Sequence, residues 1–299
     1  MSPEPDWYSA QWVTEVKPGK KANKGFVSRR NMFVLKKAQL RGKLHCDVFK
    51  MNRYLLNNIT VNIVLTRNEA KFSLIGEKGN YQIIILNPKL KVRYALISPH
   101  VRLAHEAALA KSNAKYPIDR VVMKNLTIAK LTQSLDLEVS SGYLPYQVII
   151  GLVDHDAFNG SFDKNPFNFK NFGLESLQLT SGCKNLPYDK DLICDYLNGS
   201  NNFLETYNTL FQGLDNLEGK DIDLDDFKGG NALYVFNLKP DSCNDEKLCL
   251  LEQGSVSVSM KFDKQTSDLG QSLTAIIFLK YKNIIEITQS REVLFDYKI

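Results

Sequence analysis

The chain has 299 residues, a formal net charge of +5 and a hydrophobic fraction of 43%. Such an apolar share is enough to build a core and excludes wholesale disorder, and the length suits one large β domain or two ordinary domains. The first residues contain no apolar signal-peptide core, and no run reaches the roughly 18 apolar residues of a membrane helix. We therefore expect a protein that is neither secreted nor inserted in a membrane.

The first 43 residues differ in composition from the rest. Between residues 17 and 43 there are ten Lys and Arg residues and no acidic residue, and Pro and Gly interrupt any period. We expect residues 1–43 to be a basic, poorly ordered leader. It is either a solvated charged tail or a contact for nucleic acid or a neighbouring subunit. The candidate polyanion contacts are Lys20, Lys21, Lys24, Arg29, Arg30, Lys36 and Lys37.

Short strands dominate the rest of the chain. Residues 60–65 place Val61, Ile63 and Leu65 on one face, and residues 255–262 alternate without a break. This period of two is typical of strands with one face on a core. In chain order, strands are predicted over residues 44–49, 60–65, 81–86, 90–97, 119–128, 146–153, 174–180, 232–238, 255–262, 273–281 and 284–288.

Two helices are predicted among these strands. Ser98 is a suitable N-cap and Pro99 suits the first helical position. Apolar residues then follow at helical spacing up to Leu109. The second predicted helix, over residues 202–211, carries its aromatic and leucine residues on one stripe.

No catalytic or metal-binding spacing stands out. The triplet Asp154-His155-Asp156 cannot converge on a strand, because adjacent side chains point to opposite faces. The acidic run from Asp221 resembles the start of an EF-hand loop but has Asp226 where glycine is needed. We therefore expect no enzyme, no metal, no cofactor and no small-molecule substrate.

The five cysteines match no zinc-binding pattern. We expect free thiols in a reducing compartment. A disulfide between Cys243 and Cys249 is the open alternative.

The stretch from residue 154 to 169 is the most informative of the chain. Residues 157–169 contain four aromatics, three asparagines and a proline, which suits a structured, partly buried loop. We expect the phenylalanines to be packing or interface anchors, the proline to set a turn, and the asparagines to bond loop backbone groups. Packing within one chain and contact between subunits both remain open. The residues of this structural or interface motif are Asp154, Phe158, Asn159, Gly160, Asn165, Pro166, Phe167, Asn168 and Phe169.

Many short strands with few helices predict an all-β fold, a sandwich or jelly roll. Short motifs also occur in the order LHCDVF (44–49), YLLNNI (54–59), SPHVRLAH (98–105), AKYP (114–117), GLVD (151–154), AFNG (157–160), NPFNF (165–169), LYVFNLKPD (233–241) and NIIEI (283–287). In this collinear order they resemble the hexon-like major capsid proteins of Polinton (Maverick) and adintovirus elements. The stretch DFKGGN at 226–231 departs from that family's pattern.

The resemblance implies a double jelly roll with a structural function, in which three copies form a pseudo-hexameric capsomer. The chain is short for two rolls, so the N-terminal roll is interpreted as truncated. Residues 44–78 would be the last strands of a first roll, and residues 79–299 a complete second roll with a long loop insertion at 154–231.

The resemblance also implies partners and a location. The partners are further copies in a trimer and capsid lattice, minor capsid or other jelly-roll chains, and nucleic acid through the basic leader. The location is a virion or the cell interior. The alternative function is a domesticated or degenerate single jelly-roll binding module that assembles no capsid.

Overall fold

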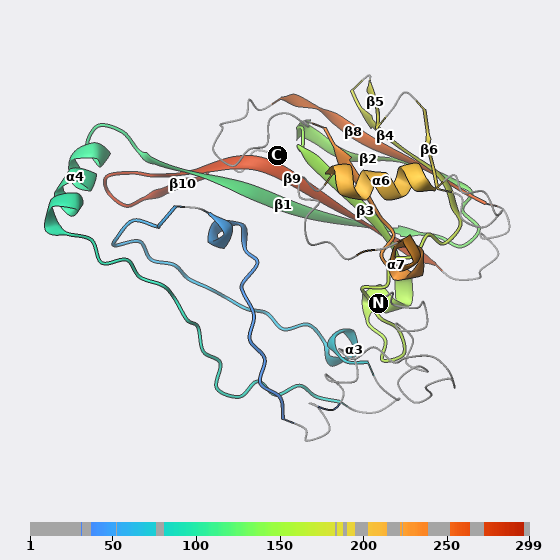
Figure 1. Cartoon of the computed structure of the whole chain (residues 1–299), viewed down its shortest axis with the longest axis horizontal. Helices are drawn as coiled ribbons and strands as arrows, with labels where there is room; N and C mark the ends of the chain where they lie inside the picture. The colour runs from blue at the N-terminus through green and yellow to red at the C-terminus, as the bar shows by residue number, and fades with distance from the viewer. Residues whose placement is uncertain are drawn as a thin grey trace.

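The computed structural model of the chain describes residues 37–51, 53–75, 81–182, 184–187, 190–194, 203–213, 224–238, 252–263 and 272–295, together with residues 31 and 222. Figure 1 shows a β sandwich, a pair of long strands that projects from it, and an extended segment that runs beside this pair. The strands are β1 Ala114–Ile128, β2 Ser134–Tyr143, β3 Gln147–Asp154, β4 Leu174–Ser181, β5 Lys184–Leu186, β6 Leu192–Ile193, β7 Leu233–Asn237, β8 Gln253–Phe262, β9 Leu273–Ile287 and β10 Val293–Phe295. The helices are η2 Asp47–Lys50, α3 Ala70–Ser73, α4 Pro99–Leu109, α5 His155–Asn159, α6 Leu204–Gly213 and α7 Leu224–Gly230.

The strand order is that of a jelly roll. One sheet has the order β1-β9-β3-β7, with β10 also on β9, and the other has the order β2-β8-β4-β5, with β6 also on β4. The antiparallel pairs β1·β9, β2·β8, β3·β7 and β4·β5 are nested in sequence, and successive pairs lie in alternate sheets. Eight strands in two such sheets make a jelly roll. The predicted all-β jelly roll with few short helices is therefore confirmed.

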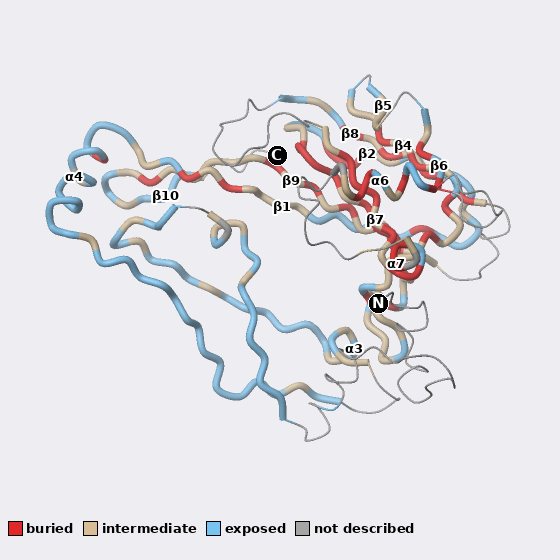
Figure 2. The backbone as a smooth tube through the Cα atoms, viewed as in Figure 1, coloured by how far each residue is buried: buried red, intermediate tan, exposed pale blue. Residues whose placement is uncertain are grey.

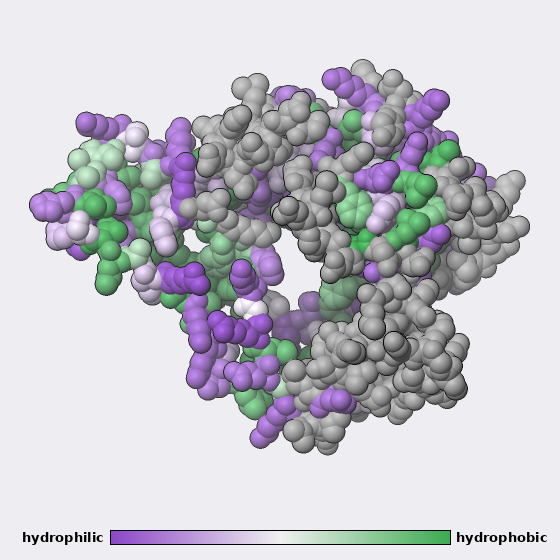
Figure 3. Space-filling view, viewed as in Figure 1, coloured by the Kyte–Doolittle hydropathy of each residue, from purple (hydrophilic) through white to green (hydrophobic). Residues whose placement is uncertain are grey.

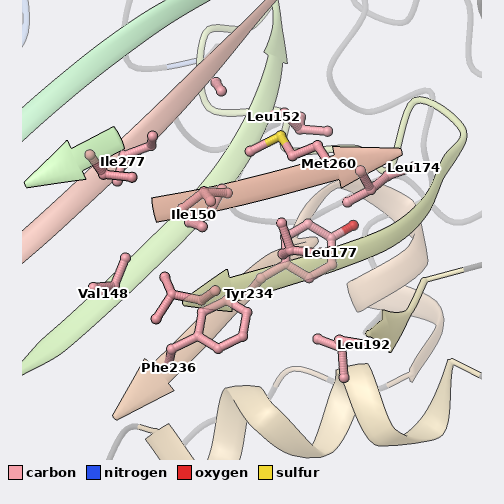
Figure 4. Packing of buried hydrophobic residues seen from close by; sticks show 14 of the residues in the cluster. Val148, Ile150, Leu152, Leu174, Leu177, Leu192, Tyr234, Phe236, Met260 and Ile277 are labelled. Atoms are coloured by element: carbon pink, nitrogen blue, oxygen red, sulfur yellow. The ribbon is translucent and has the colours of Figure 1, made fainter. Parts of the chain in front are cut away.

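The core lies between the two sheets because the strands alternate. β8 buries Val256, Val258 and Met260 and leaves the intervening serines half-buried or exposed on its outer face. All three belong to the main core, and Figure 4 shows Met260 among the side chains of β3, β4 and β7, such as Ile150, Leu177 and Tyr234. The apolar face of each sheet is thus covered by the other sheet.

The outer face of β3 and β7 is covered by helices. Leu210 of α6 and Phe227 of α7 form a second, smaller core with Val235 of β7, and Ile149 of β3 packs against it. This explains why β3 reads as a continuous apolar run, since a central strand covered on both sides has no polar face.

Both predicted helices are confirmed, with small shifts in their bounds. α4 begins at Pro99, and the Ser98 hydroxyl accepts a hydrogen bond from the Val101 N–H at 3.5 Å. Only Leu109 of this helix is buried, so its apolar face has little cover. The second predicted helix is α6, which covers the sheet. Within the described residues, no helix is both long enough and apolar enough to cross a membrane.

Some strands differ from the prediction. β2 was not predicted, although Leu135, Leu137 and Val139 alternate with acidic residues. The predicted strands 273–281 and 284–288 form one continuous strand, β9. The interval 154–231, predicted to be a long loop insertion with one clear strand, contains β4, β5 and β6 as well as three helices. It therefore supplies three of the five strands of one sheet.

The first strand of the roll, β1, is an edge strand of its sheet, and side chains from an earlier segment contact its outer edge. The Asp47 carboxylate accepts a hydrogen bond from the Val121 N–H at 3.1 Å. The Arg53 guanidinium donates to the Lys115 carbonyl at 2.8 Å, and the Tyr116 hydroxyl donates to a backbone carbonyl of the same segment at 3.2 Å. The motifs at residues 44–59 thus lie along the edge of β1.

Apart from the short helix α3, the described segment between η2 and α4 is extended, but it forms no backbone hydrogen-bond ladder with a described strand. Residues 60–65, 81–86 and 90–97 pair with none of the described strands, and residues 44–49 contain the helical turn η2 instead of a strand. Figure 2 shows this segment as largely exposed, in contrast to the sandwich. The sequence pattern indicates a strand-like conformation, but a strand also needs a neighbour that supplies hydrogen bonds. The division into a remnant at 44–78 and a roll from 79 remains a prediction.

The packing of the sandwich leads to a prediction. Leu177 is fully buried at its centre, so Leu177→Ala is expected to lower the free energy of unfolding by about 2–5 kcal/mol, because it removes apolar contacts and leaves a cavity. Urea unfolding followed by circular dichroism measures this. Met123→Ala is the control: Met123 of β1 is 62% exposed, and its replacement is expected to change stability by less than about 0.5 kcal/mol.

Candidate functional site

The motif loop after β3 begins at Asp154, which caps α5 and also binds Lys164 from further along the loop. Asp154 ends β3, and its Oδ1 accepts hydrogen bonds from the N–H groups of Asp156 at 2.9 Å and Ala157 at 3.3 Å, which caps α5. Ten residues on, Lys164 Nζ donates to both Asp154 carboxylate oxygens at 3.0 and 2.9 Å and to Asp156 Oδ2 at 3.0 Å. Lys164 therefore closes the loop onto the end of β3.

The charges of this cap favour the ion pair. The hydrogen bond from Lys164 lowers the pKa of Asp156 below its usual range. Burial opposes the charged form of Lys164, but its hydrogen bonds to Asp154 and Asp156 outweigh burial and raise its pKa. Both directions stabilise the charged pair at neutral pH.

His155 links α5 to the sheet. Its Nδ1 lies 2.9 Å from Thr274 Oγ1 of β9, and the Asn159 amide Nδ2 lies 2.9 Å from its Nε2. Each ring nitrogen thus has one hydrogen-bond partner, one on the sheet and one on α5. The imidazole therefore points at β9. Asp154 and Asp156, in contrast, converge on Lys164, because residues 155–159 form the helix α5 and not the strand that would separate them. Asn159 bonds the imidazole, not the loop backbone group that its residue type suggested.

The NPFNF turn has the predicted construction in part. Asn165 Oδ1 accepts from the Phe167 N–H at 2.9 Å, its carbonyl accepts from the Asn168 N–H at 3.3 Å, and Pro166 between them is buried. This is the side-chain-supported turn expected of asparagine. Asn168 differs, because its Oδ1 is buried with no hydrogen-bond partner among the described residues.

Phe169 joins the loop to the sheet beside β7. Its N–H donates to the Gly230 carbonyl at 2.8 Å, and its carbonyl accepts from the Ala232 N–H at 2.9 Å. Its ring lies on the backbone of β3 at Gly151, where an added Cβ would meet Phe169 Cδ1 at 2.7 Å and Leu233 Cδ2 at 2.9 Å. Gly151 thus leaves the space in which this ring packs.

The outer side of the loop faces the earlier extended segment. Gly160 has φ +97°, and an added Cβ there would lie 3.2 Å from the backbone nitrogen of Phe72 in α3. The rings of Phe167 and Phe72 pack edge to face with centroids 6.0 Å apart. Phe162 and Tyr81 pack in the same way at 5.3 Å. Phe158 is half-buried.

The predicted polyanion contacts fall almost wholly outside the described residues. Lys37 is described and exposed. The others lie outside the described ranges: Lys20, Lys21, Lys24, Arg29, Arg30 and Lys36. Their role stays a prediction.

The five cysteines are likewise divided between described residues and residues outside the described ranges. Cys46 is exposed and Cys194 is buried in the main core, where burial raises the pKa of its thiol to about 12. Cys183, Cys243 and Cys249 lie outside the described residues, so the disulfide alternative stays open. In the part of the chain that the structure describes, no group of three or more His, Cys, Asp and Glu residues could hold a metal ion.

Three residues of the site escaped sequence reasoning. Lys164 lies within the motif, but nothing in its spacing indicates that it bonds Asp154. Lys71 and Phe72 lie some 90 residues earlier, and only tertiary structure places them at the loop.

Comparison with known proteins gives one related sequence and several similar structures. No known family profile matches the chain. The uncharacterized protein F54H12.2 of Caenorhabditis elegans is 24% identical over 301 residues, which cover 96% of this chain and 69% of that protein.

The similar solved structures come from viruses. The Sputnik virophage structure has a TM-score of 0.41 at 11% identity, covering 62% of this chain and 39% of that chain. PBCV-1 VP54, fitted into a Sputnik reconstruction, has 0.40 at 12%, covering 68% and 55%. The mavirus major capsid protein has 0.35 at 9%, covering 62% and 41%. The chain thus spans about 39–55% of the length of these structures, and the fold assignment rests on its own strand order.

The ring of Phe169 on Gly151 leads to a prediction. Gly151→Ala is expected to destabilise the protein by about 1–3 kcal/mol, because the new methyl group forces the ring and its hydrogen-bonded strand to shift. The midpoint of thermal unfolding reports this loss. Gly42→Ala is the control, since a Cβ there meets nothing within 4 Å, and an unchanged midpoint in both variants would contradict the packing described.

The turn at Asn165 leads to a second prediction. Asn165→Ala removes the acceptor for the Phe167 N–H and is expected to lower the free energy of unfolding by about 1 kcal/mol. Asn165→Asp keeps an acceptor and should retain most of the stability. Equal losses in the two variants, measured by urea unfolding, would show that the hydrogen bond does not stabilise the turn.

Proposed function

We propose that this chain is a non-enzymatic, capsid-type structural protein that works by associating with further copies of itself. One observation carries the proposal: a closed jelly roll stands beside an extended segment whose apolar side chains are uncovered. Of the 24 large hydrophobic residues found exposed in the described part of the chain, 17 lie between residues 40 and 103. Apolar surface so concentrated is typical of an interaction site.

The segment 89–96 has the pattern of a strand that lacks its sheet. Its even positions carry Leu90, Val92, Tyr94 and Leu96, all exposed, with Leu96 fully so. Its odd positions carry Lys89, Lys91 and Arg93. One face therefore suits an apolar partner and the other suits water or acidic groups.

The backbone of this segment can also pair with a partner strand. An extended chain with no ladder offers free N–H and C=O groups, which readily pair with another strand. In the space-filling view of Figure 3, an opening lies between the projecting strands and the extended segment. A further β element that fills such a place would bury apolar side chains and satisfy backbone groups together.

The finer proposal follows the collinear motifs. They favour a protein of the Polinton and adintovirus capsid kind, with trimeric capsomers, contact of the basic leader with nucleic acid, and a location in a virion or the cell interior. On this proposal, the strands that cover residues 60–97 come from another β unit.

The mass of the full chain in solution tests the proposal. Light scattering at moderate salt is expected to give a discrete trimer. A well-folded monomer over the same concentration range would overturn the capsid-type function and favour the single jelly-roll binding module.

A variant on the apolar strand face sharpens this test. The double variant Tyr94→Asp with Leu96→Asp is expected to convert the trimer to monomer, because it places charges in a surface that must lose water on association. Far-UV circular dichroism should show that the roll is still folded, since neither residue lies in it, while the melting midpoint falls with the loss of association. The control is Leu131→Asp, which alters a residue that is 62% exposed in a turn of the roll and should leave the trimer intact.

A further inference from the structure

The motif loop has two sides with different partners. On its inner side, Asp154, Lys164 and Phe169 bond the loop to the end of β3 and to the backbone beside β7. This side is anchored on the rigid sandwich. The outer side then becomes a fixed surface on which another segment can rest.

The outer side contacts α3 and Tyr81 at three points. Gly160 lies against the backbone of α3, Phe167 packs edge to face on Phe72, and Phe162 packs edge to face on Tyr81. We call this contact the α3 joint. Edge-to-face aromatic pairs stabilise beyond the area that they bury, so two such pairs give the joint a defined geometry.

Gly160 satisfies two requirements of the joint at once. Its φ of +97° is a backbone conformation that other residues rarely adopt. The space where a Cβ would stand is also filled, with Lys71 Cγ at 2.9 Å and the Phe72 backbone nitrogen at 3.2 Å. A glycine at this position therefore allows the backbone of α3 to approach the loop.

We infer that the motif loop is a receptor for the chain's own α3 and for Tyr81, and that the α3 joint sets where the unpaired strands begin relative to the roll. This assigns the motif to contact within one chain. Tyr81 is the first of the large apolar residues found exposed between α3 and α4, so the joint fixes one end of this part of the surface offered to a partner. The inference goes beyond the proposed function and does not depend on it, because the contacts lie within a single copy.

Limited trypsin digestion of the full chain tests the joint. The peptide bond after Lys71 lies in α3, and the Lys71 side chain is 45% exposed. Trypsin needs an extended backbone to cleave this bond, so cleavage reports how often α3 unfolds and leaves the loop. Gly160→Ala and Phe167→Ala are each expected to raise the cleavage rate at this bond about two- to tenfold, in line with the loss of an aromatic pair or a close backbone contact. Mass spectrometry of the fragments measures the rate.

Two controls match these variants. Gly182→Ala also replaces a glycine of positive φ, but a Cβ there meets nothing within 4 Å. Met123→Ala removes a large side chain of the roll that is 62% exposed, the same fraction as Phe167. Both should cleave after Lys71 at the parental rate.

Two outcomes would overturn the inference. One is a parental cleavage rate after Lys71 in Phe167→Ala and Gly160→Ala. The other is an equal rise in the two controls, which would indicate general loosening of the roll. Light scattering of the same samples keeps this result separate from the question of trimer formation.

Discussion

Each strand of this protein has an apolar face that must be covered, and the rest of the structure depends on this constraint. The jelly roll meets it by nesting four antiparallel pairs, so that Ala114 at the start of β1 lies opposite Ile287 near the end of β9. Successive pairs alternate between two sheets, and the inner faces cover each other. Helices α6 and α7 cover the outer face of β3 and β7.

The end of β3 is where the closed roll connects to the motif loop and, through it, to the earlier extended segment. Gly151 leaves space for the Phe169 ring, Asp154 caps α5, and Lys164 returns the loop to Asp154. The abundance of phenylalanine in this loop then has a physical reason. Some rings pack inward on the sheet, while Phe162 and Phe167 pack outward on residues of the earlier segment.

The same constraint is not met in residues 60–65 and 81–97. These residues are extended and apolar, yet the described strands give them neither a ladder nor a covering face. In water such a segment is costly as long as it stays uncovered, and association with further β structure lowers that free energy. Under the proposed capsid-type function, this partner belongs to a further copy of the chain. The α3 joint and the contacts on the edge of β1 hold the segment in a fixed position.

The sequence alone determined the elements whose signals are local. The period of two in residues 255–262, the Ser98-Pro99 start of α4 and the turn at Asn165 follow from alternation, capping and side-chain hydrogen bonds within a few residues. Tertiary structure alone decided which extended segments became strands, because a hydrogen-bond ladder needs a neighbouring strand. Residues 134–143 pair with β8, whereas residues 90–97 pair with none of the described strands. It also decided that Lys164 bonds Asp154 and that Phe72 rests on the motif loop. These contacts join residues ten or more positions apart, which is beyond the reach of the local patterns of strands, caps and turns.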